Sequence, residues 1–493
     1  MIKTNSNNIK QLAPAFHKYG ADFTWSQCTD TFKPDLHAVD VEMQAFKNNL
    51  QVTALVAPLT DSEFETAMKG AYQTGRLDFG MYFLTWAWEN PNTKKLEALP
   101  SWVGTSFTQQ EVDLGIISTD KVGQTRQANY YTINNPLFEL SNGKYGYDDD
   151  NHRMGQVDVV SGSVKQQFDW FKSVFGKYPS YSSYSYGRHI LDDLLLPRLM
   201  GTRGNTIQND TSSYSFNREQ GVDRMVSSVF NYNVRDKGMN VALENSKNNL
   251  SKAITNNGWF NDFSHWHWAS SYGDKNQWSQ FFEQQRNLIG SNKVVSLGID
   301  KAFEYQYLRN MVQSIYLVEN NGTYYVQVET KDEYKPSLPK QSIKTKLSVH
   351  LDLENTPLEG KDITSTTEIK KVDINRFIVE VPYVKGNGFS IVEIKSTTNP
   401  TYMNFELPKI SFVELSGLTL KINTDQPTNV VVFTCDKDAE TYNSKIAVRD
   451  NTMSTAHTLT LTDISNKDIY VGVITKTKQS ILQEGVVNGR NLY

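Results

Sequence analysis

The sequence predicts a mixed α/β domain followed by all-β modules, and three observations lead to this fold class. The chain has 493 residues, whereas a single hydrophobic core stops growing at roughly 250 to 300 residues, so two or three domains are expected. Residues 31 to about 311 alternate between strand-like apolar runs and longer amphipathic stretches, which is typical of an α/β layer or barrel. After about residue 319 apolar residues alternate with polar ones between turn signals, which indicates β-sandwiches.

The first part of the chain predicts its elements in order. Four segments carry apolar residues at helical spacing, and we expect helices there: residues 39–46, a stretch that begins at Asp61 or Ser62, 164–175 and 278–289. The run at 51–58 is strand-like. Residues 202–257 are polar and rich in Asn, Ser and Tyr, which favours an insertion or a long loop.

The second part of the chain predicts two β-sandwich modules of immunoglobulin-like type. We expect the α/β domain to occupy residues 1–319, the first module 320–400 and the second module 401–493. The turn at Asn399-Pro400 marks the second boundary. Three strand-like runs stand out in the last module, namely 418–422, 429–433 and 469–474.

Composition and charge exclude several classes of function. A content of 38% hydrophobic residues is enough for packed cores, and a net charge of −4 offers no field for nucleic acid. The polar start and the lack of an apolar run of about 20 residues predict neither a signal peptide nor membrane insertion. Cys28 and Cys435 lie far apart in sequence, which argues against a disulfide framework.

Four motifs occur in a fixed order along the α/β part. A strand-like run ends in Thr29-Asp30, and a later one carries Gly80 followed by Tyr82 and Trp86. A helix then leads into Gly-Lys-x-Pro at 176–179 and a run that ends in Tyr-Gly at 186–187. The last motif contains His265, Trp266 and His267 before another helical stretch.

In this order and spacing, the motifs resemble the polysaccharide deacetylase (carbohydrate esterase) superfamily over residues 20–310. The resemblance implies a diverged, TIM-like (β/α) barrel with a glycan groove at the carboxyl ends of its strands. In active members a bound metal ion activates a water molecule that attacks an acetyl group. The resemblance places Asp30 on the metal-binding aspartate and Thr29 on the general base, although a threonine hydroxyl cannot accept a proton near neutral pH.

Other positions of the resemblance have also changed. Tyr82 and Trp86 stand where the family has two metal-binding histidines, and neither side chain replaces imidazole as a ligand. In the third motif Ser183 to Ser185 replace an arginine and two prolines. The pattern therefore predicts that the frame persists while catalysis is weak or lost.

A rebuilt site is the alternative. In a strand, His265 and His267 project to the same side, as in a metal-binding His-x-His pair. Catalysis would then fall to Asp30 and His265, and a metal ion such as zinc would be held by Asp30, His265 and His267. The competing interpretation places both histidines in an aromatic layer, and Asp30 at a strand end, with no cofactor.

Aromatic residues at the strand ends are candidates for glycan contact. Tyr181, Tyr184 and Tyr186 recur along one strand-like run and could share a face, although the edge of a packed core accounts for them equally well. The candidate glycan-binding residues are Tyr82, Trp86, Tyr184, Tyr186 and Trp266.

Three classes of function follow. The first is a metal-dependent glycan deacetylase or esterase with a rebuilt site, and the third is an unrelated cytosolic α/β hydrolase. The second, which the substituted motifs favour, is a structural or glycan-contact subunit. A barrel fused to two β-sandwiches resembles tail and receptor-contact components of bacteriophage particles. We therefore expect a homo-oligomeric virion protein, made in the host cytoplasm, that meets a cell-surface glycan and other particle subunits; the alternative location is the cytoplasm.

Overall fold

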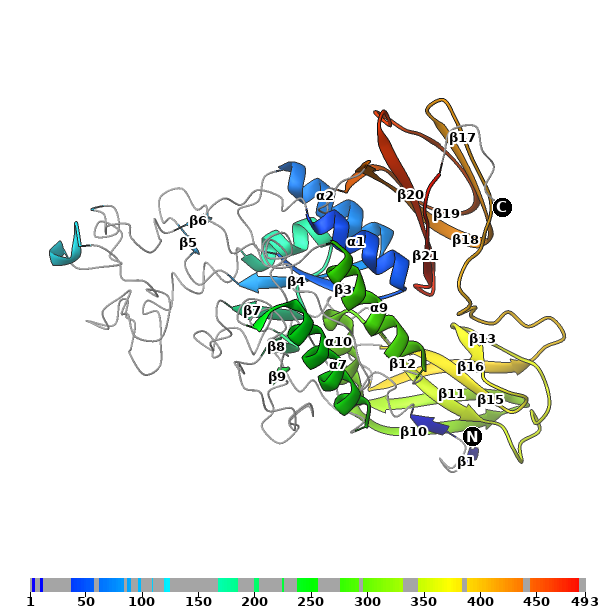
Figure 1. The fold of residues 1–493 in the computed structure, drawn as a ribbon. Coiled ribbons are helices and arrows are strands. Elements are labelled where there is room, and N and C mark those ends of the chain that lie inside the picture. The colour runs from blue at the N-terminus through cyan, green and yellow to red at the C-terminus, as the bar shows by residue number, and fades with distance from the viewer. Residues whose placement is uncertain are drawn as a thin grey trace.

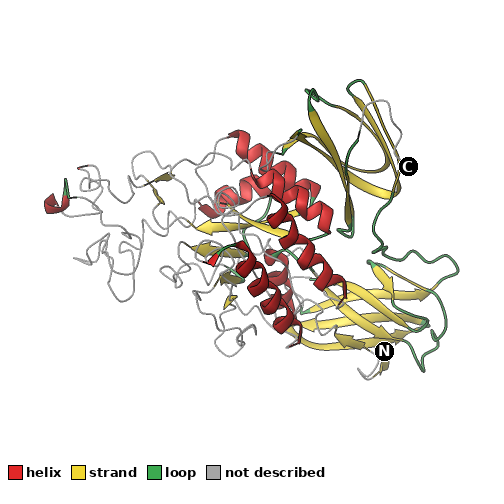
Figure 2. Ribbon diagram, in the orientation of Figure 1, coloured by secondary structure: helices red, strands yellow, loops and turns green. Residues whose placement is uncertain are grey.

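The computed structural model is a mixed α/β protein with many antiparallel strands (Figures 1 and 2). Helices gather around a parallel sheet in the centre, and two all-β units lie to the right of this layer in both views. Among the described residues, no helix combines the length and apolar composition that crossing a lipid bilayer requires. The structure describes residues 2–4, 9–11, 37–56, 62–83, 87–89, 96–98, 109, 119–124, 167–184, 199–203, 224–225, 237–255, 275–291, 296–330, 345–383, 388–437 and 444–486.

The central sheet is entirely parallel, and its strand order follows the chain. Among the described strands, the first and last of this row form its two edges, and no pairing between them closes it. A short hairpin of β5 (Ala87–Glu89) and β6 (Leu96–Ala98) stands apart from it. In pairing order the parallel strands are β3 (Val52–Val56), β4 (Leu77–Phe83), β7 (Tyr181–Tyr184), β8 (Gly201–Arg203) and β9 (Arg224–Met225).

Helices cover this sheet and bury a shared apolar core. Phe79 of β4 stacks on Phe175 with ring centroids 4.8 Å apart, and Phe175 also contacts Phe171. A single 3₁₀ turn, η3, spans Thr119–Lys121. The helices are α1 (His37–Asn48), α2 (Ser62–Thr74), an unlabelled helix over 167–175, α7 (Met239–Thr255), α9 (Lys275–Ser291) and α10 (Ile299–Met311).

Four of the predicted helices are confirmed, but the interpretation of residues 202–257 as a loop is wrong for α7. Met239, Ala242, Leu243 and Leu250 are buried on one face of this helix. Their spacing of three, four and seven residues is helical, but Asn, Ser and Lys between them concealed the pattern.

The first all-β unit is a sandwich of two sheets that pack face to face. Val326 and Val392 of one sheet meet Val349, Leu351 and Phe377 of the other in a common core. One sheet has the order β1 (Ile2–Thr4), β10 (Val312–Asn320), β11 (Thr323–Thr330), β16 (Phe389–Ser396) and β13 (Ile363–Ser365). The other has the order β14 (Ile369–Lys371), β15 (Arg376–Pro382), β12 (Lys346–Asp352) and β2 (Ile9–Gln11).

The sandwich begins where α10 ends. Val312, the first residue of β10, directly follows Met311, and β10 pairs with β11 across residue 320. Helix α10 ends at Met311, and strand structure starts at Val312. The all-β part thus begins eight positions before the boundary that the sequence predicts at residue 320. The division of the chain into independent domains remains a prediction.

The second all-β unit is one bent sheet around its own apolar core. The runs 418–422 and 429–433, which the sequence predicts as separate strands, belong to a single strand whose register shifts between Asn423 and Thr428. The strands are β17 (Ile410–Ser416), β18 (Thr419–Asp436), β19 (Lys445–Thr460), β20 (Lys467–Thr475) and β21 (Ser480–Gln483).

This sheet packs against α1 through its outer face. Met43 and Phe46 of α1 lie in one buried cluster with Val431, Phe433 and Ile474. The Phe46 and Phe433 rings meet edge to face, with centroids 5.8 Å apart. The C-terminal sheet is therefore anchored to the outer helices of the α/β layer.

Candidate functional site

The sequence predicts a glycan groove at the carboxyl ends of the parallel strands, where two of its candidate residues fall within the described strands. Tyr82 is the sixth residue of β4, and Tyr184 is the last residue of the neighbouring β7. In the parallel register Tyr82 is opposite Ser183, and Tyr184 is opposite Phe83. The structure thus brings the backbones of both candidate residues to the same end of adjacent strands, at neighbouring register positions.

The other predicted site residues lie outside the described part of the chain. The metal and catalytic roles assigned to Asp30, His265 and His267 therefore remain predictions. The same holds for the position of Thr29 on the general base. Of the candidate glycan contacts, those outside the described residues are Trp86, Tyr186 and Trp266.

The prediction that Tyr181 shares a face with Tyr184 and Tyr186 is wrong for Tyr181. This side chain is fully buried and stacks on Phe303 of α10, with ring centroids 5.4 Å apart. Tyr181 is three residues from Tyr184, and an odd spacing places two strand residues on opposite faces. Tyr181 therefore belongs to the core between β7 and α10.

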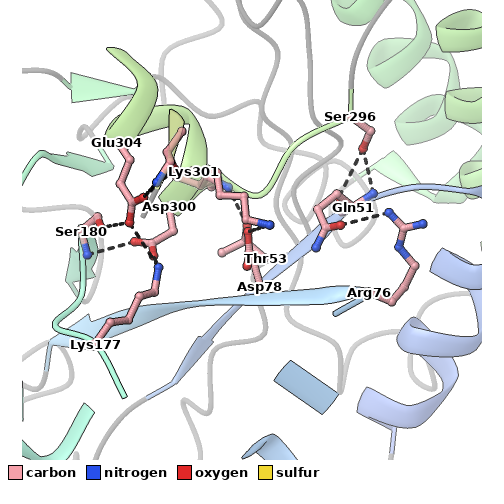
Figure 3. Close-up of polar contacts among 12 residues, drawn as sticks. Gln51, Thr53, Arg76, Asp78, Lys177, Ser180, Ser296, Asp300, Lys301 and Glu304 are labelled. Atoms are coloured by element: carbon pink, nitrogen blue, oxygen red, sulfur yellow. Dashed lines mark hydrogen bonds and ion pairs between the residues drawn. The ribbon is translucent and has the colours of Figure 1, made fainter. Parts of the chain in front are cut away.

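A line of polar side chains, most of them buried, occupies the opposite, amino-terminal end of the same strands, and we call it the amino-edge row (Figure 3). It runs from the start of β7, past the starts of β4 and β3, to the turn before β21. Its members come from β3 and β4, from the segments before β3, β4, β7 and α10, and from the first turns of α10. They are Gln51, Thr53, Arg76, Asp78, Lys177, Ser180, Ser296, Asp300, Lys301 and Glu304.

One end of the row is a buried ion cluster. The Lys177 ammonium forms an ion pair with Asp300 and lies 3.4 Å from Glu304 Oε1. The Ser180 amide donates to Asp300 Oδ1 at 2.9 Å, and the Ser180 hydroxyl donates to Glu304 Oε1 at 2.8 Å. Thr345, just before β12, donates its amide and hydroxyl to Glu304 Oε2 at 3.1 and 2.5 Å. The cluster therefore connects β7, α10 and the sandwich.

The charges of this cluster are unequal, because two carboxylates share one ammonium group. Burial disfavours the charge of Lys177, but Asp300 and Glu304 together outweigh it, so the pKa of Lys177 lies well above its usual value. Burial raises the pKa of Asp300 to about 6; Lys177 opposes this shift and Glu304 adds to it. Lys177 therefore stays protonated, and burial favours the neutral, protonated form of Asp300 as the solution becomes mildly acidic.

The middle of the row attaches the start of α10 to the sheet. The Ile299 amide, in the first turn, donates to the Thr53 hydroxyl at 2.8 Å, and the Gln51 amide donates to Ser296 Oγ at 2.8 Å. Thr53 thus satisfies one of the amides that a helix start leaves without a partner. Asp78 packs so closely on Gly298 that a Cβ at residue 298 would overlap its carboxylate.

The other end of the row is a buried arginine whose hydrogen-bond acceptors, among the described residues, are all uncharged. Arg76 is 2% exposed and donates to Gln51 Oε1 at 3.0 Å and to Ser480 Oγ at 2.7 Å. It also donates to Asn49 Oδ1 and to the Lys478 carbonyl. Burial lowers the pKa of Arg76 to about 9, with Asp78 opposing the shift. Arg76 thus joins the start of β4 to the C-terminal sheet.

Comparisons with known proteins add no family to this description. No protein-family model matches the chain, and no curated protein matches it. The deacetylase resemblance therefore depends only on the motifs of this sequence.

The amino-edge row has the chemistry of a structural connection. Asp300, Glu304 and Lys177 are at most 5% exposed, and their polar atoms contact one another and neighbouring backbone groups. Within the described ranges, no group of three or more His, Cys, Asp or Glu side chains is arranged to hold a metal ion.

Sequence reasoning missed this row, although one signal for it was present. Asp300 and Glu304 lie four residues apart, which places both carboxylates on one face of a helix. Lys177 was noted only as part of the Gly-Lys-x-Pro motif. Their meeting depends on packing between segments more than a hundred residues apart, which local periodicity does not encode.

Proposed function

We propose that the protein is a structural, glycan-contacting subunit of a phage-like particle, built on a catalytically degenerate barrel of the polysaccharide deacetylase type. The observation that carries the proposal is the direction of the parallel strands relative to the two all-β units. Strand β4 points away from both all-β units, and its neighbours run parallel to it (Figure 1). A subunit of this shape can be held by its all-β units while its opposite end meets a glycan.

The contacts at the amino-terminal ends of the strands support this arrangement of the all-β units and the strand ends. Glu304 and Thr345 connect the layer to the sandwich, and Arg76 connects it to the C-terminal sheet. Both all-β units are therefore attached on the side where the parallel strands begin. The carboxyl ends, which bear Tyr82 and Tyr184, lie at the other side.

The strand order supports the barrel. In a doubly wound sheet the strand order reverses at a switch point, whereas strands in a (β/α) barrel follow one another in chain order. The five parallel strands have the second arrangement, from β3 to β9. Ligands of such barrels bind at the carboxyl ends of the strands, which is where the sequence places the glycan groove.

Glycan contact is assigned to the aromatic residues at this end. A sugar ring presents C–H groups that pack well on an aromatic face, so Tyr82 and Tyr184 are suitable as two separate contacts. The register that pairs Tyr82 with Ser183 and Phe83 with Tyr184 places these two positions on opposite faces of the sheet. The partners of the proposal are a cell-surface glycan and further particle subunits, including copies of this chain, and its location is the virion.

The test combines localisation with binding. Mass spectrometry of purified particles should detect the polypeptide, and titration of the purified protein with cell-surface polysaccharide should show saturable binding. Tyr82→Ala and Tyr184→Ala should each weaken this binding by about tenfold, the upper range for one aromatic contact. Phe405→Ala removes an exposed aromatic from the segment before β17 and should leave binding unchanged.

Other outcomes point to other functions. A protein that is absent from every particle fraction and binds no glycan would overturn the proposal. Robust acetate release that disappears in Asp30→Ala, together with stoichiometric zinc in the purified protein, would instead establish the rebuilt deacetylase site at Asp30, His265 and His267.

A further inference from the structure

The N-terminal arm, defined as β1 and β2, adds one strand to the edge of each sheet of the sandwich. Strand β1 pairs with β10, with Lys3 opposite Val318, and β2 pairs with β12, with Lys10 opposite His350. Strand β2 also contacts β10, so the arm crosses from one sheet to the other along the same side of the sandwich. In Figure 1 the N-terminus and β1 lie beside β10.

The strands that receive the arm are longer than the arm strands. Strand β10 has nine residues and β12 has seven, whereas β1 and β2 have three each. Among the described strands, only the arm pairs with these two edges. Without the arm, β10 and β12 would be the outermost strands of their sheets, and such edges are templates for pairing with another chain.

The receiving edges are held in place by the sandwich core. Leu317 and Val318 of β10 are each 2% exposed, and Val349 and Leu351 of β12 are fully buried. These are the positions that the arm pairs with. A preformed edge offers its backbone amides and carbonyls to an added strand without reorganisation, and main-chain hydrogen bonds supply the affinity in this mode of recognition.

The segment between the arm and the α/β layer is long enough for a sandwich to receive the arm of its own chain or that of a neighbouring copy. Residues 12–36 join β2 to α1, and at about 3.4 Å per residue such a segment could bridge roughly 80 Å when extended. This reach exceeds the size of a single domain. An arm that leaves its own sandwich and pairs with that of a neighbour makes the same backbone contacts, so the exchange costs little free energy in a symmetric assembly.

We propose that in the assembled state the N-terminal arm of one copy pairs with β10 and β12 of a neighbouring copy. The sandwich is then the docking site of the subunit, and its partner is a second copy of this chain. This inference rests on the proposed role as a particle subunit, but it does not depend on glycan contact. Strand donation links each copy to the next and covers two sheet edges at once.

Cysteine pairs across the arm contact test this proposal. The experiment uses the full chain with Cys28→Ser and Cys435→Ala. Directly opposite residues of an antiparallel pair have Cα atoms about 4.5 to 5.5 Å apart, which is within disulfide reach. One variant of the chain carries Lys3→Cys and a second variant carries Val318→Cys. The two variants are co-expressed, purified together and oxidised.

A disulfide between these two variants can form only between copies. Arm exchange predicts that about half of the protein runs as a covalent dimer on a non-reducing gel, because two equally abundant variants that associate at random form the Lys3→Cys to Val318→Cys contact in only that share of the copies. The matched control replaces Val318→Cys by Tyr325→Cys, which lies opposite Val318 on β11 and thus one strand further from the arm. This control should give no dimer. The pair Lys10→Cys with His350→Cys repeats the test on the other sheet.

A single chain that carries both Lys3→Cys and Val318→Cys separates the remaining outcomes. If it loses its thiols but remains a monomer, and the co-expressed variants give no dimer, the arm pairs only with its own sandwich and the proposal is wrong. If no disulfide forms in either experiment, the arm does not occupy β10 and the proposal is also wrong. Dimers from purified protein would support arm exchange even if the polypeptide were missing from particles, so this test is separate from that of the proposed function.

Discussion

The two all-β units are attached to the same α/β layer by different kinds of contact. The sandwich is tied by a compact ion cluster in which Glu304 joins Lys177 to Thr345. The C-terminal sheet is held mainly by a broad apolar contact around Phe46 and Phe433. The buried Arg76 and the ion pair between Arg449 of β19 and Glu42 of α1 lie at its border.

Chain connectivity explains this difference. The sandwich follows α10 without a loop, since Val312 directly continues from Met311, so its position is already restricted. The ion cluster and Tyr305 of α10, which packs into the sandwich core, complete the attachment. The C-terminal sheet is reached through residues 397–409, which form no helix or strand, and its nearest covalent neighbour is the sandwich. Only a large buried surface can place it on α1. The comparison predicts that a lost charge weakens the first attachment most and a lost ring weakens the second most.

The largest expected effect is on the ion cluster. Lys177→Met leaves Asp300 and Glu304 buried without their cation, and removal of one partner from a buried pair costs about 3 to 5 kcal/mol. Chemical denaturation should show this loss in the free energy of unfolding. Lys69→Met, at an exposed position of α2, is the matched control and should change stability by less than about 0.5 kcal/mol.

A triple variant separates the charge from the packing. Lys177→Met with Asp300→Asn and Glu304→Gln removes all three charges, so it should be more stable than Lys177→Met alone. If the single variant cost less than about 1 kcal/mol, the ion cluster would not be what fixes the sandwich.

A somewhat smaller effect is expected at the apolar contact. Phe46 is fully buried, and its ring packs against Phe433 and the backbone of Gly472. Phe46→Ala should cost about 3 kcal/mol. It should also make residues 397–409 more sensitive to limited proteolysis, because the C-terminal sheet would detach from α1.

The control for this variant is another phenylalanine. Phe389 lies on β16 and is 44% exposed, so Phe389→Ala should affect neither stability nor cleavage at 397–409. Equal proteolysis of the Phe46→Ala variant and the unchanged protein would show that polar contacts alone hold the C-terminal sheet.

The fold was predictable where one periodicity dominated a segment. Helix α1 and strand β3 follow from local spacing, as do the alternating strands of the sandwich. Helix α7 was missed because only Met239, Ala242, Leu243 and Leu250 mark its buried face among many polar residues. The bend in β18 was read as a strand break, because a register shift and a turn leave similar signals in sequence.

The candidate sites were predictable to different degrees. The spacing that pointed to Tyr82 and Tyr184 also predicted their strands, and the structure places both near the same end of one sheet. The amino-edge row was not predictable, because Lys177 meets Asp300 only through packing of β7 on α10. The edge role of β1 and β2 was equally hidden, since three-residue strands have no periodicity of their own.

The smallest effect expected from the comparison is a pH dependence at the C-terminal attachment. Lys478 lies in the turn before β21, and its amine packs against Gly75. Burial, followed by the charge of Lys301, lowers the pKa of Lys478 to about 8 from an ordinary value of 10.5. Between pH 8 and 10.5 the unfolded chain therefore binds a proton that the folded protein does not bind, so stability increases as the pH rises through this window. The gain amounts to about 2 to 3 kcal/mol when the whole window is crossed.

Lys478→Met removes the titrating group, so this variant should be more stable than the unchanged protein at pH 7, and the difference should shrink as the pH approaches 10. Denaturation at a series of pH values measures both curves, and the effects of other titrating groups cancel in their difference. Two parallel curves would mean that Lys478 is hydrated in the folded protein, and that the C-terminal attachment depends on its apolar contact, on Arg76 and on the Glu42–Arg449 ion pair rather than on Lys478.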